Sequence, residues 1–323
     1  MTSAHKPRVT VLGSFVADLT FLTATLPAWG QTVLGSGFRL GPGGKGSNQA
    51  VAAARLGAAV TFITKLGADP FGALARRTYE TEGIDTQFCL EAPDEPTGAA
   101  SVTVHEGRGE NAIVVFPGSG LRLTADDVDR AEGRISESAV FATQFEVPMA
   151  AAERGLELAW RAGTITILNP APAREMPDRL YALCDYLTPN ESEAAALVGH
   201  PVVSRADADR AADCLLARGV RNVVITLGAG GALVKSSRGT THVPAIDAGP
   251  VVETTGAGDA FNGGLAVGLA EGLDAVAATR LGCAAAGISV TRPGTALSMP
   301  ARLEVERLLA CRQPAVGPTS RLP

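Results

Sequence analysis

A glycine-rich turn that leads into a carboxylate and an apolar helix pattern lies between Glu253 and Gly264. Backbone N–H groups at the start of a helix have no helical partner, and with the helix dipole they attract an anion such as a phosphate. Asp259 would repel that phosphate, so its position makes sense if it faces a hydroxyl group that attacks the phosphate. A glycine-rich helix start with an acidic residue in its first turn is also common without any such role. The stretch alone leaves both interpretations open.

A second glycine-rich segment, Gly41–Asn48, lies early in the chain. Its glycines fit the G-x-G-x-x-G pattern of dinucleotide sites, but that pattern should follow the first buried strand of the fold. The first predicted strand, Val9–Leu12, has no glycine-rich turn after it. The segment also lacks a Walker sequence, because Gly46 follows Lys45 where Ser or Thr is required. We therefore expect neither a dinucleotide fold nor a P-loop.

The same segment offers close backbone approach at Gly43 and Gly44, a cation in Lys45 and an amide in Asn48. Such groups suit a small polyol, whose hydroxyls both donate and accept hydrogen bonds. Asp18, just after the first strand, adds a carboxylate that can accept from two neighbouring hydroxyls. Taken singly, a turn-capping Asp18 and a solvated Lys45 would be the safer interpretation. Their common place at the carboxyl ends of strands favours the ligand-binding interpretation.

The elements that must position these residues alternate between strand and helix over most of the chain. Short apolar runs predict buried strands, and alanine-rich stretches such as Gln49–Leu56 predict helices. We therefore predict an α/β fold with a doubly wound, mostly parallel sheet that helices cover on both faces. Strands within about 15–40 and 97–116 do not fit that layer, and we expect them to form a small β-strand lid. The predicted single domain spans 1–311, and we expect 312–323 to be a disordered tail.

Composition disfavours several classes of function. The chain has 323 residues, 46% of them hydrophobic, and a net charge of -5, which argues against a nucleic-acid partner or an anionic membrane surface. No apolar run is long enough to cross a bilayer and no signal peptide is evident, so we expect a cytoplasmic protein. The 5 cysteines never form a CxxC pair and the 4 histidines are dispersed, which indicates free thiols and no metal cluster.

Five motifs fall in the order and spacing of the ribokinase-like carbohydrate kinases, which the chain resembles from about Val9 to Leu309. These motifs are Gly43-Gly-Lys-Gly-Ser-Asn48, Asn169-Pro-Ala-Pro-Ala173, Pro189-Asn-Glu191, Thr226-Leu-Gly228 and Thr255-Gly-Ala-Gly-Asp259. The resemblance is specific, because two separate glycine motifs agree with several motifs that lie between them.

The resemblance implies an ATP-dependent kinase that phosphorylates the primary 5-hydroxyl of a pentose. Asp259 would be the general base, and the backbone N–H groups of Gly256, Ala257 and Gly258 would form the anion hole for the transferred phosphoryl group. The sugar contacts that it implies are Val16, Asp18, Gly43, Gly44, Lys45, Asn48, Glu146 and Asp259. The ATP contacts that it implies are Asn190, Thr226, Gly228, Ala229, Gly231, Gly258 and Cys283.

The resemblance also implies two metal ions. Mg²⁺ binds few carboxylates directly and keeps several waters, so Glu193 is expected near it in an indirect role. K⁺ is the expected activator, at a site that would be formed by Glu253, Thr255, Ser289, Arg292, Gly294 and Ser298. The family usually has Asp where this chain has Glu253, and the longer side chain would shift the ion or weaken its effect.

A second departure from the family bears on the sugar. The family usually reads Gly-Ser-x-Asn-x-Asp after the first strand, whereas this chain reads Gly13-Ser-Phe-Val-Ala-Asp18. Val16 thus replaces a polar Asn, and a buried hydroxyl left without its partner costs about 1–3 kcal/mol. D-ribose is the expected substrate because every other sugar position matches. The alternative is 2-deoxyribose, since the related deoxyribokinases carry an apolar residue there.

Two further alternatives fit the sequence less well. The Gly43–Gly46 segment disfavours a nucleoside or hexose kinase of the same family, and the intact Gly256–Asp259 turn disfavours a nucleotide-binding sensor without catalysis. The predicted lid should close over the sugar and exclude water. Its strands carry apolar side chains at Val102, Val104, Ile113 and Val115, and because exposed strand edges need cover, we expect a homodimer through the lid.

Overall fold

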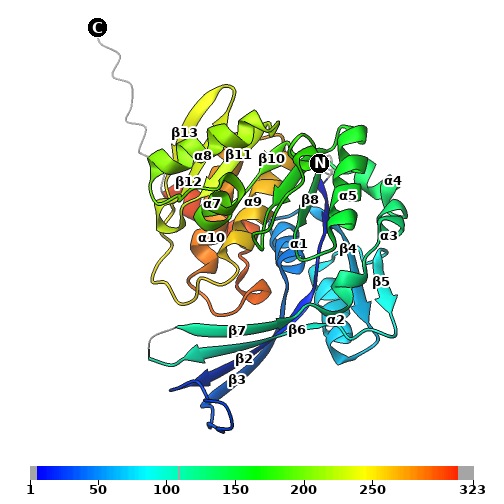
Figure 1. Ribbon diagram of the computed structural model, residues 1–323, viewed down its shortest axis with the longest axis vertical. Coiled ribbons are helices and arrows are strands. Elements are labelled where there is room, and N and C mark those ends of the chain that lie inside the picture. Colours follow the sequence, from blue (N-terminus) through cyan, green and yellow to red (C-terminus); the bar gives the residue numbers. More distant parts are fainter. Residues whose placement is uncertain (1–5, 108–109, 312–323) are drawn as a thin grey trace.

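The computed structural model describes residues 6–107 and 110–311. Within these ranges the strands form a nine-stranded sheet and a separate four-stranded sheet (Figure 1). The large sheet contains, in spatial order, β13 (Gly239–Val243), β12 (Ala232–Ser236), β11 (Asn222–Thr226), β10 (Tyr186–Leu187), β9 (Ile165–Asn169), β8 (Val140–Gln144), β1 (Arg8–Leu12), β4 (Ala59–Gly67) and β5 (Cys89–Ala92). From β11 to β5 all neighbours pair in parallel, whereas β12 and β13 form an antiparallel edge.

Helices cover both faces of this sheet, as predicted. They are α1 (Lys45–Arg55), α2 (Pro70–Glu82), α3 (Ala125–Asp129), α4 (Glu132–Ser136), α5 (Met149–Ala162), α6 (Asp178–Tyr181), α7 (Glu191–Val198), α8 (Arg205–Ala217), α9 (Ala257–Ala270), α10 (Ala275–Ser289) and α11 (Arg302–Cys311), with short 3₁₀ turns η1 (Gly118–Arg122), η2 (Gly228–Gly230) and η3 (Ala296–Ser298). One apolar core contains side chains of α1, α2, α9, α10 and α11, and a second contains side chains of α3 to α8.

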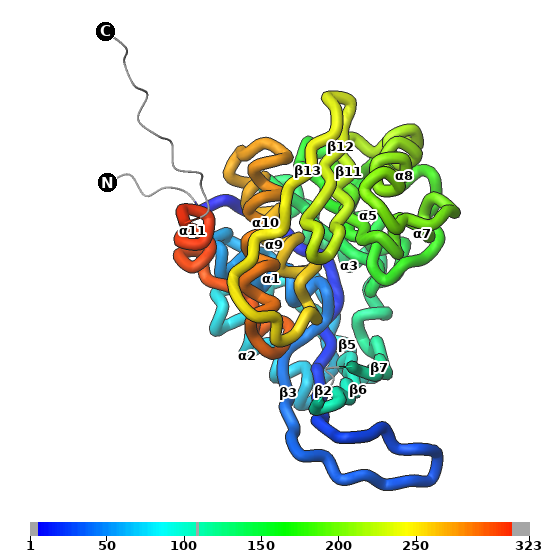
Figure 2. The backbone as a smooth tube through the Cα atoms, turned by 90° about the vertical axis from the view of Figure 1, so that its left-hand side faces the viewer, coloured from blue at the N-terminus to red at the C-terminus, as the bar shows by residue number. Residues whose placement is uncertain are grey.

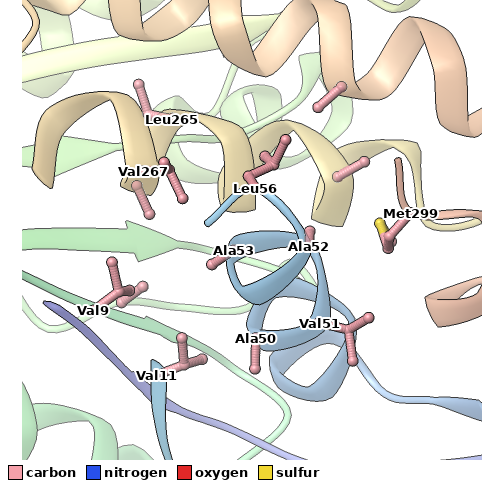
Figure 3. Packing of buried hydrophobic residues seen from close by; sticks show 14 of the residues in the cluster. Val9, Val11, Ala50, Val51, Ala52, Ala53, Leu56, Leu265, Val267 and Met299 are labelled. Carbon is pink, nitrogen blue, oxygen red and sulfur yellow. The ribbon is translucent and has the colours of Figure 1, made fainter. Parts of the chain in front are cut away.

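Strand alternation explains why two cores form. Successive side chains of a strand point to opposite faces, and both faces of a parallel sheet are buried. Val9 and Val11 of β1 therefore belong to the first core and Leu12 to the second. Figure 3 shows the alanine-rich α1 packed near β1 and α9 in the first core. A Cβ at Gly263 of α9 would lie 2.5 Å from the Ala52 Cβ, so glycine there permits this close approach of α9 to α1.

The four-stranded sheet is the predicted lid. It contains, in spatial order, β3 (Gly37–Gly43), β2 (Val16–Thr23), β6 (Gly98–His105) and β7 (Asn111–Phe116). Only residues 13–15 separate β1 from β2, so the lid leaves the large sheet at the carboxyl end of β1. The lid strands extend away from the large sheet in Figure 1, and the connection between β2 and β3 projects farthest in Figure 2. The lid thus covers the edge where open α/β sheets bind ligands.

One local expectation was wrong, and one strand was not predicted. The glycine-rich segment does not precede a helix that begins at Gln49, because β3 continues to Gly43 and α1 already begins at Lys45. Gly44 makes the break between them with a φ of 87°, a conformation that favours glycine. The strand β5 lies at the sheet edge and was not expected from its short, mixed sequence.

The predicted tail at 312–323 lies outside the described residues, and the division into one domain at 1–311 stays a prediction. Among the described helices, none has the length and apolar character needed to cross a membrane.

Candidate active site

Two cavities meet at the start of α9. The lid-side cavity, of about 240 Å³, lies between the lid and the large sheet, and Val16, Asp18, Asn48 and Glu146 are among its lining residues. The strand-side cavity, of about 160 Å³, lies at the carboxyl ends of β9, β10 and β11. Lys45, Gly256 and Asp259 line both cavities. A group bound in one cavity would therefore reach a group bound in the other at these three residues.

Asp259, in the first turn of α9, is only 5% exposed. Its Oδ2 accepts a hydrogen bond from Asn48 Nδ2 at 2.9 Å, and its Oδ1 accepts one from Gln49 Nε2 at 3.1 Å. Burial raises the pKa of Asp259 above its ordinary value, while the Lys45 charge and the two amides oppose that shift. A carboxylate with a raised pKa, whose charged form is still stabilised by neighbouring donors, is suited to accept a proton.

The turn before α9 presents backbone rather than side chains to the strand-side cavity. Gly256 adopts a φ of 84°, which favours glycine, and caps the helix. A Cβ at Gly258 would meet nothing within 4 Å, so the backbone there borders open space. The Ala257 N–H donates to Thr254 O at 3.2 Å. A helix start with open backbone of this kind binds anions.

Asp18 reaches the lid-side cavity from β2. A Cβ at Gly43 of the neighbouring strand β3 would overlap the Asp18 carboxyl group, so glycine is needed opposite it. Thr295 Oγ1 donates to Asp18 Oδ2 at 2.7 Å. Burial raises the pKa of Asp18 to about 6, and the nearby carboxylates of Glu146, Glu253 and Asp259 add to the shift, whereas the Thr295 hydrogen bond lowers it.

Lys45 and Asn48 come from the first turn of α1. The Lys45 backbone N–H donates to Glu146 Oε2 at 2.8 Å, and Ser14 Oγ donates to the same oxygen. Burial by itself would lower the pKa of Lys45, but the carboxylates of Asp259, Glu146 and Glu193 outweigh it, and the pKa is raised. Among the described residues, the buried Asn48 Oδ1 has no hydrogen-bond partner. The cavity thus offers acceptors and a cation to a polar ligand.

Comparison with known proteins agrees with this geometry. A model of the pfkB family of carbohydrate kinases matches residues 6–302. A ribokinase from Haemophilus influenzae is 39% identical over 301 residues, which are 93% of this chain and 98% of that protein. A deoxyribokinase from Salmonella typhi is 36% identical over 293 residues, 90% of this chain and 95% of that protein. The structure of Arabidopsis thaliana ribokinase complexed with ribose and ATP has a TM-score of 0.87 at 29% identity and covers 94% of this chain and 99% of that one.

The chain belongs to the pfkB family of carbohydrate kinases. It is an ATP-dependent sugar kinase, and the fold and family expected from its motifs are confirmed.

The structure brings some, but not all, of the expected nucleotide residues of the kinase to the strand-side cavity. Asn190, Thr226 and Gly258 line it, together with Glu193, which was expected near Mg²⁺. Asn190 caps α7 and exchanges hydrogen bonds with Glu193 in a capping box. Other expected nucleotide residues do not line either cavity in the described part of the chain: Gly228, Ala229, Gly231 and Cys283.

These outlying residues have clear local roles. Gly228 and Ala229 form the η2 turn after β11. Gly231 adopts a φ of 90°, and a Cβ there would overlap the Val243 carbonyl oxygen. Cys283 lies on α10 in the first core, where burial raises its pKa to about 12. The thiol of Cys283 is therefore neutral at ordinary pH, and its expected contact with ATP stays a prediction.

The positions expected to hold K⁺ in the kinase lie in the loop before α9, at the end of α10 and in the segment that follows α10. Glu253 Oε2 accepts from the Gly294 N–H at 2.9 Å and from Arg39 Nη2 of β3 at 3.3 Å. The hydroxyls of Ser289 and Ser298 donate to the carbonyls of Ala286 and Thr295. Arg292 forms an ion pair with Glu304, and Thr255 and Gly294 line the lid-side cavity. Among these residues, only oxygen atoms, mainly those of backbone carbonyls, could coordinate a monovalent cation.

Three residues of the site in the kinase were not expected from the sequence: Gln49, Thr295 and Arg39. Gln49 could have been found, because it follows Asn48 directly in a helix that enters the site. Thr295 and Arg39 carry no pattern that distinguishes them from ordinary loop and strand residues. They reach the site only because the fold places β3 beside the segment that precedes α11.

Proposed function

We propose that the kinase transfers the γ-phosphoryl group of ATP to the 5-hydroxyl of D-ribose, which gives ribose 5-phosphate and ADP. The observation that carries this proposal is that Asp259 and Gly256 line both cavities. A hydroxyl in the lid-side cavity and a phosphate in the strand-side cavity would meet at one carboxylate. The kinship to a ribokinase, and the fold shared with a ribokinase complexed with ribose and ATP, support D-ribose as the acceptor.

In this proposal Asp259 removes the proton of the 5-hydroxyl as its oxygen attacks the γ-phosphorus. The bond to the β-γ bridging oxygen breaks, and ADP leaves with that oxygen. Negative charge on the transferred group is stabilised by the backbone N–H groups of Gly256, Ala257 and Gly258 and by the Lys45 ammonium. The Ala257 N–H already has a backbone acceptor at 3.2 Å, so Gly256 and Gly258 would contribute more.

Sugar hydroxyls would be bound by the polar side of the lid-side cavity. Asp18 and Glu146 offer carboxylate acceptors. Gly44 lines this cavity, whereas Gly43 does not and instead makes room for the Asp18 carboxyl group. No aromatic side chain lines this cavity in the described part of the chain, which leaves a nucleobase without a stacking partner and supports a simple sugar over a nucleoside.

Magnesium would accompany ATP. No group of three or more metal-ligating side chains occurs among the described residues, which fits an ion held mainly by phosphate oxygens and water. Glu193 is the carboxylate of α7 that lines the strand-side cavity, and its Oε2 already accepts from the Asn190 N–H. We therefore assign Glu193 an indirect role through water. When bound, the ion would neutralise charge on the ATP phosphates.

The central test is removal of the proposed base. Asp259→Asn keeps the shape of the side chain but cannot accept the proton, and we expect kcat to fall ~10²–10⁴-fold. ADP release in a coupled assay with MgATP, K⁺ and D-ribose measures this. The exposed Asp126→Asn serves as the control and should keep the kcat of the unmodified kinase. Near-normal turnover by Asp259→Asn would reject the proposed mechanism, and the absence of sugar-dependent ADP release would reject the function.

A second candidate substrate, 2-deoxyribose, is favoured by one specific observation. Val16 is 5% exposed, packs with Ala100 and Val102, and lines the lid-side cavity. Ile113 and Val115 also line this cavity. A sugar hydroxyl that faces this apolar wall has no partner there, whereas a sugar without that hydroxyl loses nothing.

The variant Val16→Asn tests which sugar the wall selects. A restored polar partner should raise kcat/KM for D-ribose relative to 2-deoxyribose about 5- to 150-fold, as expected for one buried hydrogen bond of ~1–3 kcal/mol. The ratio of the two kcat/KM values is the measurement, and Val16→Ala, which keeps the wall apolar, should leave the ratio unchanged. An unchanged ratio in Val16→Asn would show that this wall does not determine the preference between the two sugars. The ratio in the unmodified kinase decides between the two substrates.

A further inference from the structure

Two buried glutamine side chains lie next to Asp259 without lining either cavity in the described structure. Gln49 on α1 is 2% exposed, and Gln144, the last residue of β8, is 0% exposed. Within the described residues, neither lines the lid-side or the strand-side cavity. A buried amide costs free energy unless its hydrogen bonds are satisfied. The two side chains therefore need an explanation other than ligand contact.

Their hydrogen bonds form a directed chain that ends at Asp259. Gln144 Nε2 donates to Gln49 Oε1 at 2.6 Å. Because Gln49 Oε1 is taken up in this way, its Nε2 turns to the other side, where it donates to Asp259 Oδ1 at 3.1 Å. The same Nε2 lies 3.4 Å from Asn169 Oδ1, whose own amide nitrogen donates to the Thr188 carbonyl.

Only one orientation of Gln49 is compatible with an ionised Asp259. An amide side chain can place either its oxygen or its nitrogen toward a neighbour, and the network around it decides which. The reversed orientation would bring Gln49 Oε1 against Asp259 Oδ1 and Asn169 Oδ1, which are both acceptors. The donor of Gln144 opposes that reversal. In the described structure Gln144 Oε1 has no hydrogen-bond partner, and it lies near Gly13 and Gly46.

We propose that Gln49 is a positioning residue for Asp259, and that Gln144 fixes the direction in which Gln49 donates. Together with Asn48, whose amide occupies Oδ2, Gln49 fixes the plane of the carboxyl group and favours its charged form. This inference rests on the proposed function, in which Asp259 must be ionised to accept the sugar proton. Without the Gln49 donor, burial acts on Asp259 with less opposition, and the carboxylate takes up a proton at higher pH.

Several charged groups also act on Asp259, and they are the same in the variants proposed as tests. Lys45 of α1 favours its ionised form, whereas Glu146 after β8 disfavours it. Asp18 of β2 and Glu193 of α7 also interact with the charge of Asp259. A shift caused by the loss of an uncharged amide is therefore separable from these groups, because no charge is added or removed.

The test uses Gln49→Met and Gln144→Met, which keep length and burial but remove the amide. In Gln49→Met, kcat should fall about 10- to 100-fold at neutral pH, within the range of a general base that is partly disabled. The acid limb of the pH profile of kcat should move to higher pH, so that part of the activity returns in alkaline buffer. The KM for the sugar should change less than about threefold, because the sugar-binding residues are intact. Gln144→Met should show a smaller loss of kcat and a shift of the acid limb in the same direction.

The controls separate the possible results. Gln87→Met, at an exposed position, should leave kcat and the pH profile unchanged. A lower kcat without movement of the acid limb in either variant would indicate a merely structural role and overturn the inference. If Gln49→Met fails to fold, as judged by its melting temperature, Gln144→Met alone decides by the position of its acid limb. Should Asp259→Asn retain activity, the proposed function fails; should it lose activity while both Met variants behave normally, only this inference fails.

Discussion

Asp18 is the residue of the lid-side cavity whose charge depends most clearly on pH. Burial among other carboxylates raises its pKa to about 6, although the Thr295 hydroxyl stabilises the charged form. A carboxylate accepts hydrogen bonds from two sugar hydroxyls, whereas a protonated carboxyl group loses part of that capacity. The proposed sugar contact therefore exists above about pH 6 and is lost as the pH falls through this value.

We accordingly predict that the KM for the sugar rises as the pH falls below about 6. The ionised fraction falls about tenfold for each pH unit well below a pKa, so the rise should approach that slope. Initial rates at pH 5 to 8, with sugar and ATP varied separately, measure it, and the KM for ATP should change much less. The control is Asp18→Asn, whose sugar KM should be high and nearly independent of pH. A KM for the sugar that is flat in the unmodified kinase would contradict this role of Asp18.

Residues next to a glycine motif could be predicted from the sequence, and their partners could not. Asp259, Lys45 and Asn48 each stand inside a recognisable pattern, and the structure brings all three to one place. Thr295 donates to Asp18 across a separation of 277 residues, and a single threonine carries no signal of such a contact. The direction of an amide such as Gln144 is likewise a property of the folded network.

At the scale of elements, the alternating pattern was enough to predict the parallel sheet, its helices and the separate lid. What failed was the boundary between β3 and α1. The glycines suggested a loose turn, but pairing with β2 keeps the chain extended up to Gly43, and the conformation of Gly44 starts the helix at once. This early start is functionally relevant because it puts Lys45 and Asn48 on the same helix, one turn apart.

A contact between elements also bears on the proposed activation by K⁺. Glu253, before α9, accepts hydrogen bonds from the Gly294 N–H and from Arg39 of the lid strand β3. Two donors, one of them cationic, reduce the negative charge that Glu253 can offer to a nearby ion. The side chain is 21% exposed, so solvent screens the pair only in part.

We predict that K⁺ stimulates the kinase and that Glu253→Asp needs less K⁺ for the same stimulation. The shorter side chain should release Arg39 and direct its charge toward the ion. Rates at increasing KCl, with choline chloride holding the ionic strength constant, give the half-saturating concentration, which we expect to fall severalfold. Arg39→Gln should shift it in the same direction, because it removes the competing cation. Identical K⁺ dependence in all three proteins would show that Glu253 plays no part.

At the scale of the whole molecule, the exposed apolar surface gathers on the lid. On β7, Val114 is 75% exposed and Phe116 is 49% exposed, and β7 is an edge strand. Phe21 and Phe38 lie with ring centroids 5.0 Å apart on the neighbouring strands β2 and β3 and are also exposed. Four apolar lid positions were expected to be covered by a second protomer. Of these, Val102 is already buried within a single protomer.

We predict a homodimer formed through these lid strands, because an exposed edge with apolar side chains favours pairing with a second copy. Light scattering should give twice the 33.0 kDa of one chain. The double variant Val114→Glu and Phe116→Glu should be monomeric, since charge on the edge strand opposes the contact. Val203→Glu, at an exposed position between α7 and α8, is the matched control and should remain dimeric. A monomeric unmodified kinase at working concentration would refute the proposed contact.

The two cavities share Lys45, Gly256 and Asp259 as a common boundary, and this has a consequence for inhibitor design. A single molecule in which a pentose is joined through a short phosphate chain to a nucleoside could occupy both cavities without crossing a wall of the protein. Its linker would pass the Lys45 ammonium and the Gly256 backbone. Since the two halves would be joined in advance, binding of the second would cost little additional entropy. Such a molecule would measure how well the two cavities are aligned for transfer.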